Sequence, residues 1–372
     1  MNSIGIIFSN IYDAPLGELT KKRTVASMPF GGRYRFVDFV LSNMANSGLT
    51  SVGIITKYNY QSLMDHLGSC SEWDLNRKNS GVYILPPFST GTTSVYHGNL
   101  EAMENALSFL RANKAKYVIM SDTTVICNIN YEDVVDSHKK SGADVTVIAA
   151  SADCDDCFTE SDLFVKENGG RVEDIAIGRL ISKDWLMGMG MFVMERKKLI
   201  SVIEEYVSRG RYSLEKDFIQ TEFIKGKITV NVYKFEKTIL RNHSIKSYFD
   251  NNLKLMDMKV HDEIFAKGAP IYTKVRDEAP TYYHKDAKIS NCIIADGCTL
   301  IGKAENSVFF RDVRLRSDAV VKNSIIMQGS QIGKNASLEY VIVDKNVKIG
   351  DNVSLKGSPE IPLIIPKGTT VS

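Results

Sequence analysis

Two arginines that follow a pair of glycines are the residues whose types and spacing point most directly to chemistry. The segment reads Gly31-Gly32-Arg33-Tyr34-Arg35. Adjacent glycines let the backbone come close to a ligand, and a guanidinium offers planar donors to a phosphate or a carboxylate. As chemistry alone, an ordinary loop with basic neighbours is the commoner interpretation. The segment is a candidate anion site whose meaning depends on the elements that surround it.

The first part of the chain alternates between short apolar runs and amphipathic stretches. The apolar runs predict buried strands at 4–8, 52–56, 117–120 and 144–149. Helices are predicted over 100–110 and 131–140, and another is expected to begin at Leu41 and to end near Gly48. This alternation predicts an α/β fold with a mostly parallel sheet, and such sheets bind ligands at the carboxyl ends of their strands.

The last part of the chain shows a six-residue period from about residue 285. Apolar residues spaced by six include Val341, Val347 and Val353, and also Ile326, Ile332 and Leu338. A coarser repeat of about three hexads lies over this period and matches one coil of a triangular prism. The pattern is typical of a parallel β-helix, whereas plain alternation in an antiparallel β-sandwich would not produce a register of six.

Composition sets the remaining limits. The chain has 372 residues and a formal net charge of +2, so we expect two domains and no nucleic-acid partner. Cys154 and Cys157 are close in sequence, but no second pair or histidine cluster completes a zinc site. The apolar run at 4–8 is too short for a signal peptide, and no run is long enough to span a membrane. A cytoplasmic protein with free cysteines is expected.

The block over residues 28–49, MPFGGRYRFVDFVLSNMANSGL, closely resembles the PFGG-x-YR-x-x-DF-x-LSN-x-x-NSG block of bacterial glucose-1-phosphate adenylyltransferases, or ADP-glucose pyrophosphorylases. Weaker matches lie at 96–102, 130–131 and 188–194. The resemblance covers essentially the whole chain. It implies a Rossmann-like nucleotidyltransferase domain of the GT-A type (1–245), a helical linker (246–284) and a left-handed β-helix (285–372). It also marks a vestigial nucleotide or effector pocket at Gly31, Gly32, Arg33, Arg35 and Gly98.

Positions that resemble catalytic ones in that family carry other residues here. The glycine-rich loop is rewritten over 8–20, with Pro15 near the place of its arginine, and Val25 replaces a lysine. Thr124 and Arg241 stand where active members have two aspartates that hold Mg²⁺. Gly178 lies in a segment that lacks the glutamate and lysine of the sugar-phosphate motif. A cation in place of a metal ligand would repel Mg²⁺.

These departures imply that the chain has no catalytic residues and binds no cofactor of its own. Mg²⁺ is expected only in a catalytic partner. The chain looks like the non-catalytic D-type subunit that some Gram-positive bacteria pair with a homologous catalytic adenylyltransferase in glycogen synthesis, where ATP and glucose 1-phosphate yield ADP-glucose and diphosphate. A heterotetramer is expected, with a sugar phosphate or another anion as a candidate effector and with no membrane partner.

Alternatives stay open at this point. An active or weakly active adenylyltransferase with unusual ligands would have to use Asp122 and Asp217. A β-helix acyltransferase would need a histidine beside the coils, and His284 precedes them. A free-standing sugar-nucleotide sensor is a further alternative. The two arginines of the glycine block either pair with Asp38 and fix the loop, or bind an anion or the partner.

Overall fold

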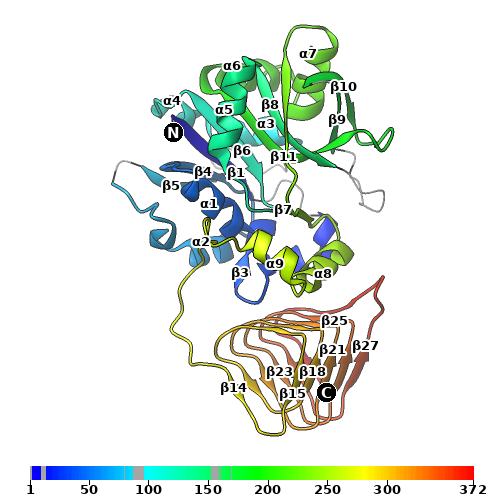
Figure 1. Cartoon of the computed structure of the whole chain (residues 1–372). Helices are drawn as coiled ribbons and strands as arrows, with labels where there is room; N and C mark the ends of the chain where they lie inside the picture. The colour runs from blue at the N-terminus through cyan, green and yellow to red at the C-terminus, as the bar shows by residue number, and fades with distance from the viewer. Residues whose placement is uncertain are drawn as a thin grey trace.

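The computed structural model describes residues 2–9, 14–78, 80–86, 96–151, 159, 161–168 and 170–372, the side chains of Ala14 and Pro15 excepted. Figure 1 shows an α/β domain stacked on a β-helix, with helices α8 (Ile245–Lys254) and α9 (Met258–Ile264) between them. None of the helices in these ranges has both the length and the apolar character needed to cross a membrane.

A mixed sheet forms the centre of the α/β domain, in the order β10-β9-β11-β6-β1-β4-β5, and β8 pairs with both β11 and β12. Its strands are β1 (Ser3–Phe8), β4 (Ser51–Ile55), β5 (Gly81–Leu85), β6 (Tyr117–Asp122), β8 (Val145–Ser151), β9 (Leu163–Asn168), β10 (Arg171–Ile177), β11 (Leu186–Glu195) and β12 (Val230–Lys234). The strands predicted near 4–8, 52–56, 117–120 and 144–149 are confirmed as β1, β4, β6 and β8.

The prediction of a mostly parallel sheet is confirmed for most of its strands and fails at β10 and β11, which run opposite to the others. Strands β6, β1, β4 and β5 run parallel, but β11 runs antiparallel to β6, β8 and β9, and β9 pairs antiparallel with β10. A strand that is buried on both faces reads as a continuous apolar run in either direction, so its sequence does not reveal its direction.

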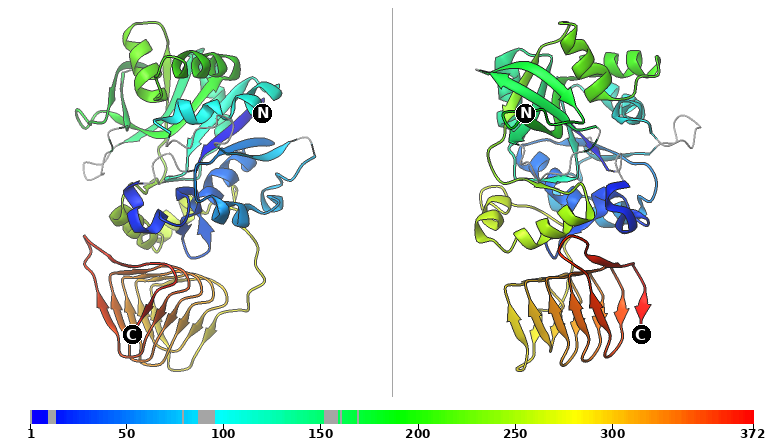
Figure 2. Two further views of the ribbon diagram at one scale, coloured as in Figure 1. Left: turned by 180° about the vertical axis from the view of Figure 1, so that it is seen from behind. Right: turned by 90° about the vertical axis from the view of Figure 1, so that its right-hand side faces the viewer.

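Helices cover both faces of the sheet (Figure 2). One face packs against α3 (Asn99–Glu104), α4 (Leu107–Ala112), α6 (Arg196–Val207), the π-helix η5 (Leu214–Gln220) and α7 (Thr221–Ile224). The other face packs against α1 (Phe36–Asn46), α2 (Gln61–Leu67) and α5 (Tyr131–Ser141). The helix predicted over 100–110 is thus two helices.

Helix α1 begins at Phe36 rather than at the predicted Leu41, and Gly48 follows its end with a φ of 76°. Its start is fixed by Asp38, whose Oδ2 accepts a hydrogen bond of 2.9 Å from the backbone N–H of Arg35. A carboxylate in the first turn satisfies an N–H that has no partner within the helix. The start was missed in the sequence because the residues around Asp38 are apolar and the N-cap residue is Arg35.

The predicted helical linker over 246–284 is helical only as far as α9. Residues 265–281 then run without helix to the first β-helix strand. That strand, β14 (Tyr282–Tyr283), pairs with Thr299 and Leu300 and lies before the predicted boundary at residue 285. Gly268, Pro270 and Pro280 interrupt the helical pattern, since glycine and proline disfavour helix interiors.

The β-helix consists of three parallel sheets (Figure 2, right). The first contains β14, β17 (Thr299–Leu300), β20 (Arg314–Leu315), β23 (Gln331–Ile332), β26 (Lys348–Ile349) and β29 (Thr370–Val371). The second contains β15 (Lys288–Ser290), β18 (Lys303–Glu305), β21 (Val320–Lys322), β24 (Ser337–Glu339) and β27 (Ser354–Lys356). The third contains β16 (Ile293–Ile294), β19 (Val308–Phe309), β22 (Ile325–Ile326), β25 (Val341–Val343) and β28 (Leu363–Ile365). The predicted left-handed β-helix is confirmed.

Short polar residues with positive φ turn the chain between these strands. They include Asn291, Asn306, Asp312, Asp318, Asn323, Asn335, Asn346 and Asn352. Asparagine and aspartate visit the left-handed region more readily than other residues with a side chain, because their short polar groups bond locally. These corners place apolar side chains such as Leu315, Ile332 and Ile349 in stacked rows inside the coils.

One apolar cluster joins the two domains. Val25, Phe30 and Tyr248 pack in the same cluster as Val308 and Ile325 of the β-helix. Because this cluster excludes water from side chains of both domains, it holds them together by the same burial that stabilises each domain's core.

Candidate functional site

The first candidate pocket lies at the carboxyl end of β6, the edge where such sheets bind ligands. Asp122 ends β6, and the chain then forms β7 (Val125–Ile126), which pairs antiparallel with β13 (Leu240–Arg241). Arg241 stands opposite Val125 in this pairing. The two strands therefore bring Thr124 and Arg241, which lie far apart in the sequence, to one pocket, as the predicted correspondence to two metal aspartates requires.

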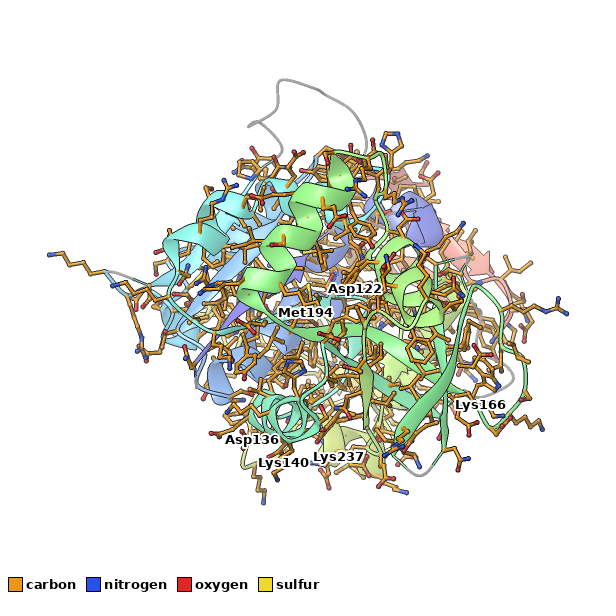
Figure 3. The ribbon with its side chains drawn as sticks, turned by 90° about the horizontal axis from the view of Figure 1, so that it is seen from above. Asp122, Asp136, Lys140, Lys166, Met194 and Lys237 are labelled. Carbon is orange, nitrogen blue, oxygen red and sulfur yellow. The ribbon has the colours of Figure 1, made fainter. Side chains whose placement is uncertain are left out.

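Both carboxylate oxygens of Asp122 accept hydrogen bonds from the turn that follows it. Its Oδ1 accepts hydrogen bonds from the backbone N–H groups of Thr123 (2.5 Å) and Thr124 (3.3 Å). Its Oδ2 accepts from the Thr124 hydroxyl at 3.1 Å. Figure 3 shows Asp122 near the middle of the view, where it is partly exposed, whereas Asp136 and Lys140 lie at the outside of α5. Burial raises the pKa of Asp122, so the folded chain disfavours its charged form.

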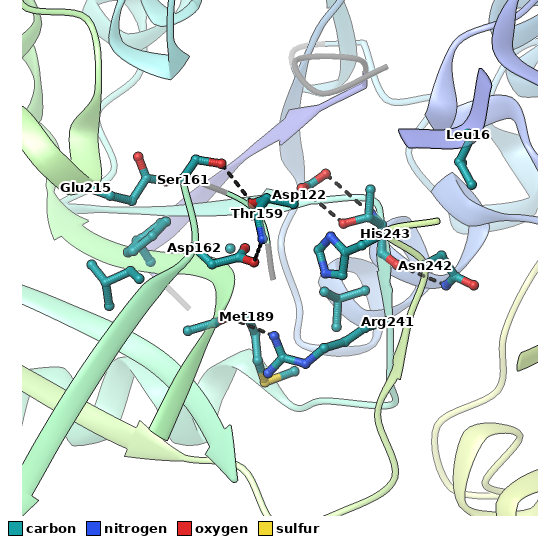
Figure 4. A pocket seen from close by; sticks show the side chains of 16 residues that line it. Leu16, Asp122, Thr159, Ser161, Asp162, Met189, Glu215, Arg241, Asn242 and His243 are labelled. Atoms are coloured by element: carbon teal, nitrogen blue, oxygen red, sulfur yellow. Dashed lines mark hydrogen bonds between the residues drawn. The ribbon is translucent and has the colours of Figure 1, made fainter. Parts of the chain in front are cut away.

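The Arg241 guanidinium is fixed by backbone carbonyls of β11. Its Nη1 donates to Gly188 O at 3.1 Å and its Nη2 to Met187 O at 3.3 Å, where the pairing of β11 with β8 is irregular. Figure 4 shows the guanidinium and the His243 ring turned into the same pocket. The Nε2 of His243 is buried and has no hydrogen-bond partner in the described part of the chain.

Two further carboxylates, Asp162 and Glu215, line this pocket. The Glu215 carboxylate accepts hydrogen bonds from Asn99 Nδ2, at 2.8 and 2.9 Å, and from Ser213 Oγ at 3.3 Å, and its burial raises its pKa. Gly178 lies beside the pocket: it has a φ of 73°, and its N–H donates to Asp162 O at 2.7 Å. Sequence inspection missed Asp162, Glu215 and His243, because no motif marks them.

The side chains in this pocket do not fit the Mg²⁺ that the family resemblance implies. Magnesium needs carboxylate oxygens that are free to face it, but both Asp122 oxygens already face the 122–124 turn. Arg241 adds a positive charge to the pocket. Within the described ranges, no group of three or more histidine, cysteine, aspartate or glutamate side chains is placed to hold a metal ion. No reaction step through a metal follows from this geometry.

Asp217, which the active alternative requires beside Asp122, lies elsewhere. Its Oδ2 accepts hydrogen bonds from the backbone N–H groups of Tyr212 (2.8 Å) and Ser213 (2.9 Å), at the start of η5. It is not among the residues that line the pocket.

Other predicted positions fall elsewhere. Val25 is buried in the cluster between the domains. Residues 10–13 of the rewritten loop, the side chain of Pro15, and Cys154 with Cys157 lie outside the described residues. Gly98 precedes α3, and a Cβ there would lie 2.3 Å from Tyr212 O. That close backbone contact explains the glycine, and Gly98 lines neither of the candidate pockets described here.

The two neighbouring glycines form the turn of a hairpin between β2 (Pro29–Phe30) and β3 (Tyr34–Arg35). A Cβ on Gly31 would lie 2.9 Å from a Leu255 methyl, and one on Gly32 would lie 3.3 Å from an Ile293 methyl. The close approach that these glycines allow is, in this structure, an approach to Leu255 at the end of α8 and to Ile293 of the β-helix.

A second candidate pocket, the basic pocket, lies where this hairpin meets the β-helix. The residues whose side chains give it positive charge or can do so are Arg33, Arg35, Arg276, Arg311, Lys345 and His66. No aspartate or glutamate is among its described lining residues. Of the residues predicted to form a vestigial pocket, Gly32, Arg33 and Arg35 line this pocket, whereas Gly31 and Gly98 do not. The pocket that contains Thr124 and Arg241 is a separate one.

Within the described residues, Asp38 forms no ion pair with an arginine of the basic pocket, although its charge favours the charged form of Arg35. Asp38 Oδ1 contacts the His66 ring at 2.5 Å, and Asp38 Oδ2 accepts from Thr273 Oγ1 at 2.5 Å and from the backbone of Arg35. The Arg35 guanidinium instead donates to Ser62 O at 2.6 Å, and burial lowers its pKa to about 10. The interpretation in which Asp38 pairs with the guanidinium groups is therefore wrong.

Arg311 is the clearest sign of an anion site. Its side chain is 7% exposed, yet its Nε has no hydrogen-bond partner within the described residues. Its Nη2 donates to Lys274 O at 3.4 Å, and the nearest carboxylate oxygen, on Asp296, lies 3.8 Å from Nε. Burial and then the charge of Arg33 lower the pKa of Arg311. A buried donor with no acceptor is costly, and an anion in the pocket would supply the acceptor.

Comparisons with known proteins agree with this architecture. A family model described as nucleotidyl transferase matches residues 14–157, and one described as GlmU-like, C-terminal hexapeptide matches residues 278–359. The glycogen biosynthesis protein GlgD of Bacillus subtilis (strain 168) is 32% identical over 365 residues, which cover 98% of this chain and 96% of that protein.

The glycogen biosynthesis protein GlgD of Geobacillus stearothermophilus is 36% identical over 369 residues, with 98% of this chain and 96% of that protein covered. A glucose-1-phosphate adenylyltransferase of Fervidobacterium nodosum is 30% identical over 364 residues, with 95% and 85% covered. With both domains matched and full-length relatives above 30% identity, the chain belongs to the family of the glycogen biosynthesis protein GlgD, which is related to the glucose-1-phosphate adenylyltransferases.

Proposed function

We propose that this chain is a non-catalytic regulatory subunit that acts on a homologous glucose-1-phosphate adenylyltransferase in bacterial glycogen synthesis. The observation that carries the proposal is the placement of Arg241 in the pocket at the carboxyl end of β6, where its guanidinium is held by Met187 O and Gly188 O. Relatives named for glycogen biosynthesis support the choice of pathway.

The chemistry of nucleotidyl transfer supports the non-catalytic part of the proposal. Transfer from a nucleoside triphosphate needs a divalent cation that bridges phosphates and neutralises developing charge. In this chain Asp122 is engaged by Thr123 and Thr124, and Arg241 shares its pocket. A weakly active enzyme would need Asp122 and Asp217 in one site. The two carboxylates instead accept hydrogen bonds from two separate turns, Asp122 from Thr124 and Asp217 from Tyr212.

The basic pocket supports the regulatory part. An anion there, such as a sugar phosphate, would contact Arg35 of the α/β domain together with Arg311 and Lys345 of the β-helix. A ligand shifts a conformational equilibrium only by the difference in its affinity for the two states. An anion that bridges two domains has this property, since any change in their placement changes its contacts.

The partner surface in this proposal includes the ends of the β-helix. Strands β14, β15 and β16 each lie at an edge of their sheet, and Tyr282 and Tyr283 are 56% and 52% exposed. Edge strands present backbone groups to which another chain can add. We propose contacts with a homologous catalytic subunit in a heterotetramer, with Mg²⁺ bound only in that subunit.

Assembly tests the proposal. The full chain is co-expressed with a glucose-1-phosphate adenylyltransferase from the same organism, and the purified material is analysed by size-exclusion chromatography with light scattering. A mixed complex larger than a dimer is expected. Two separate species that do not associate at micromolar concentration would contradict the regulatory assignment.

A further inference from the structure

Lys345 occupies a corner of the β-helix directly after Asp344 and lines the basic pocket. Asp344 is already engaged, because Arg23 Nη2 donates to its two carboxylate oxygens at 2.7 and 2.8 Å. Within the described residues, Lys345 Nζ makes no ion pair and no side-chain hydrogen bond. The residue keeps some exposed surface, but its ammonium is surrounded by protein in the pocket and has no counter-charge of its own.

The groups that act on Lys345 come from every element packed around it. They are Arg35 on β3, Arg23 before η2 (Val25–Ser27), His66 on α2, Lys367 in the last coil and Asp344 beside it. Arg33, Arg276 and Arg311 line the same pocket from its other sides. Asp344 is the one negative charge in this set, and its charge is balanced by Arg23.

Burial and the charges of Arg35 and Arg23 lower the pKa of Lys345 well below its usual range. Arginine keeps its proton in proteins, whereas a lysine that is desolvated near other cations can lose its proton. Arg35, whose pKa is lowered only to about 10, stays charged at neutral pH. Among these crowded cations, Lys345 is therefore the group that can relieve the repulsion by giving up a proton.

We propose that Lys345 is uncharged in the empty basic pocket and takes a proton from solvent onto Nζ when an anion enters, so that the pocket binds an anion and a proton together. This inference rests on the proposed anion site. The entering charge offsets the repulsion from Arg35 and the other cations of the pocket, which restores the ammonium form and adds a charge-assisted hydrogen bond to the anion.

The sign of the pH dependence follows from this uptake. Between the pKa of Lys345 in the empty pocket and its higher pKa in the occupied pocket, anion binding consumes a proton. Affinity for the anion then falls as pH rises, by at most about tenfold for each unit of pH. His66 adds nothing at alkaline pH, because burial lowers its pKa and leaves the ring neutral there.

Sulfate is the probe, because it does not titrate at these pH values. The full chain is titrated with sulfate in a calorimeter at about pH 8, above the ordinary range of histidine, in buffers of different ionisation enthalpy. The dependence of the observed heat on that enthalpy gives the protons taken up. The parent should take up close to one proton for each sulfate. Lys345→Arg, which is always charged, should bind sulfate with an uptake near zero.

Lys348→Arg is the matched control: Lys348 lies on β26 three residues away and faces solvent, so the parent's uptake should remain. If Lys345→Arg does not fold, Lys345→Met should bind sulfate more weakly and without uptake. Sulfate binding to the parent with no proton uptake would overturn this inference and leave the proposed anion site standing. A parent that binds no sulfate would overturn both.

Discussion

Arg23 in the α/β domain and Asp344 in the β-helix form a buried ion pair across the domain boundary, with Arg23 Nη2 at 2.7 and 2.8 Å from the two carboxylate oxygens. Their side chains are 3% and 4% exposed. The pair connects the segment that leads to Val25 with the corner that holds Lys345. The pair is thus a direct polar link between the α/β domain, just before Val25, and the part of the β-helix that lines the basic pocket.

Asp344→Asn should therefore destabilise the chain strongly. The substitution leaves the Arg23 guanidinium buried without its counter-charge, which typically costs about 3–5 kcal/mol. Thermal unfolding measures the effect. Glu339→Gln removes one partner of the exposed Lys356–Glu339 pair in the same β-helix and should cost less than about 1 kcal/mol. Equal losses in the two variants would show that the buried pair is not a special link.

The two arginines of the hairpin should matter for regulation. In an assembled complex, Arg33→Ala with Arg35→Ala should reduce the activation of the catalytic partner while the complex remains intact, because the basic pocket loses two of its cations. The double variant Arg209→Ala with Arg211→Ala has the same spacing on an exposed segment and serves as the control. Undiminished activation by the hairpin variant would make Arg33 and Arg35 structural only.

Asp122→Asn should stabilise the chain at neutral and alkaline pH. Burial raises the pKa of Asp122, so ionisation favours the unfolded chain, and the loss of stability grows as pH rises above the ordinary aspartate range. Asparagine keeps an acceptor for the Thr123 N–H and removes this loss. The gain in Tm should vanish in acid, where Asp122 of the parent is protonated in both the folded and the unfolded chain.

Asp136→Asn, on the exposed face of α5, is the control for the Asp122 variant and should show no such gain. If Asp122→Asn lowers Tm at alkaline pH, the Asp122 carboxylate is needed in its charged form, which contradicts the inference that the folded chain disfavours that form.

Gly31→Ala should be more destabilising than a similar change elsewhere. Gly31 has a φ of 59°, where an added side chain costs roughly 1–2 kcal/mol, and the new methyl would also meet Leu255 at 2.9 Å. Gly226 has a φ of 66° and no atom within 4 Å of an added Cβ, so Gly226→Ala isolates the backbone cost. Equal drops in Tm would contradict the tight contact between the hairpin and α8.

The β-helix could be predicted because its information is local and repeated. Each coil places apolar residues such as Val341 and Val347 at the same spacing, and the structure stacks them in one interior. The strands of the α/β domain were recognisable as apolar runs for the same reason. Strand direction was not, since β11 reads as a buried run whichever way it points.

The basic pocket could be predicted only in part. Arg33 and Arg35 follow a recognisable glycine pair, but Arg311 and Lys345 sit among the corner residues of the coils and look like ordinary solvent-facing charges. Only the packing of the hairpin against the β-helix, through Gly32 and Ile293, brings the four cations together. Residues that are this far apart in sequence show no regular spacing, so a single sequence does not reveal that they are in contact.

One set of rate measurements tests the central claim most directly. ADP-glucose formation from ATP and glucose 1-phosphate with Mg²⁺ is measured for the chain alone, for the homologous catalytic subunit alone and for the two together. We expect no turnover by the chain alone, and a gain of roughly 5- to 100-fold in the partner's rate or apparent affinity for glucose 1-phosphate when the two are mixed. Robust turnover by the chain alone, or a partner whose kinetics are unchanged by it, would contradict the account.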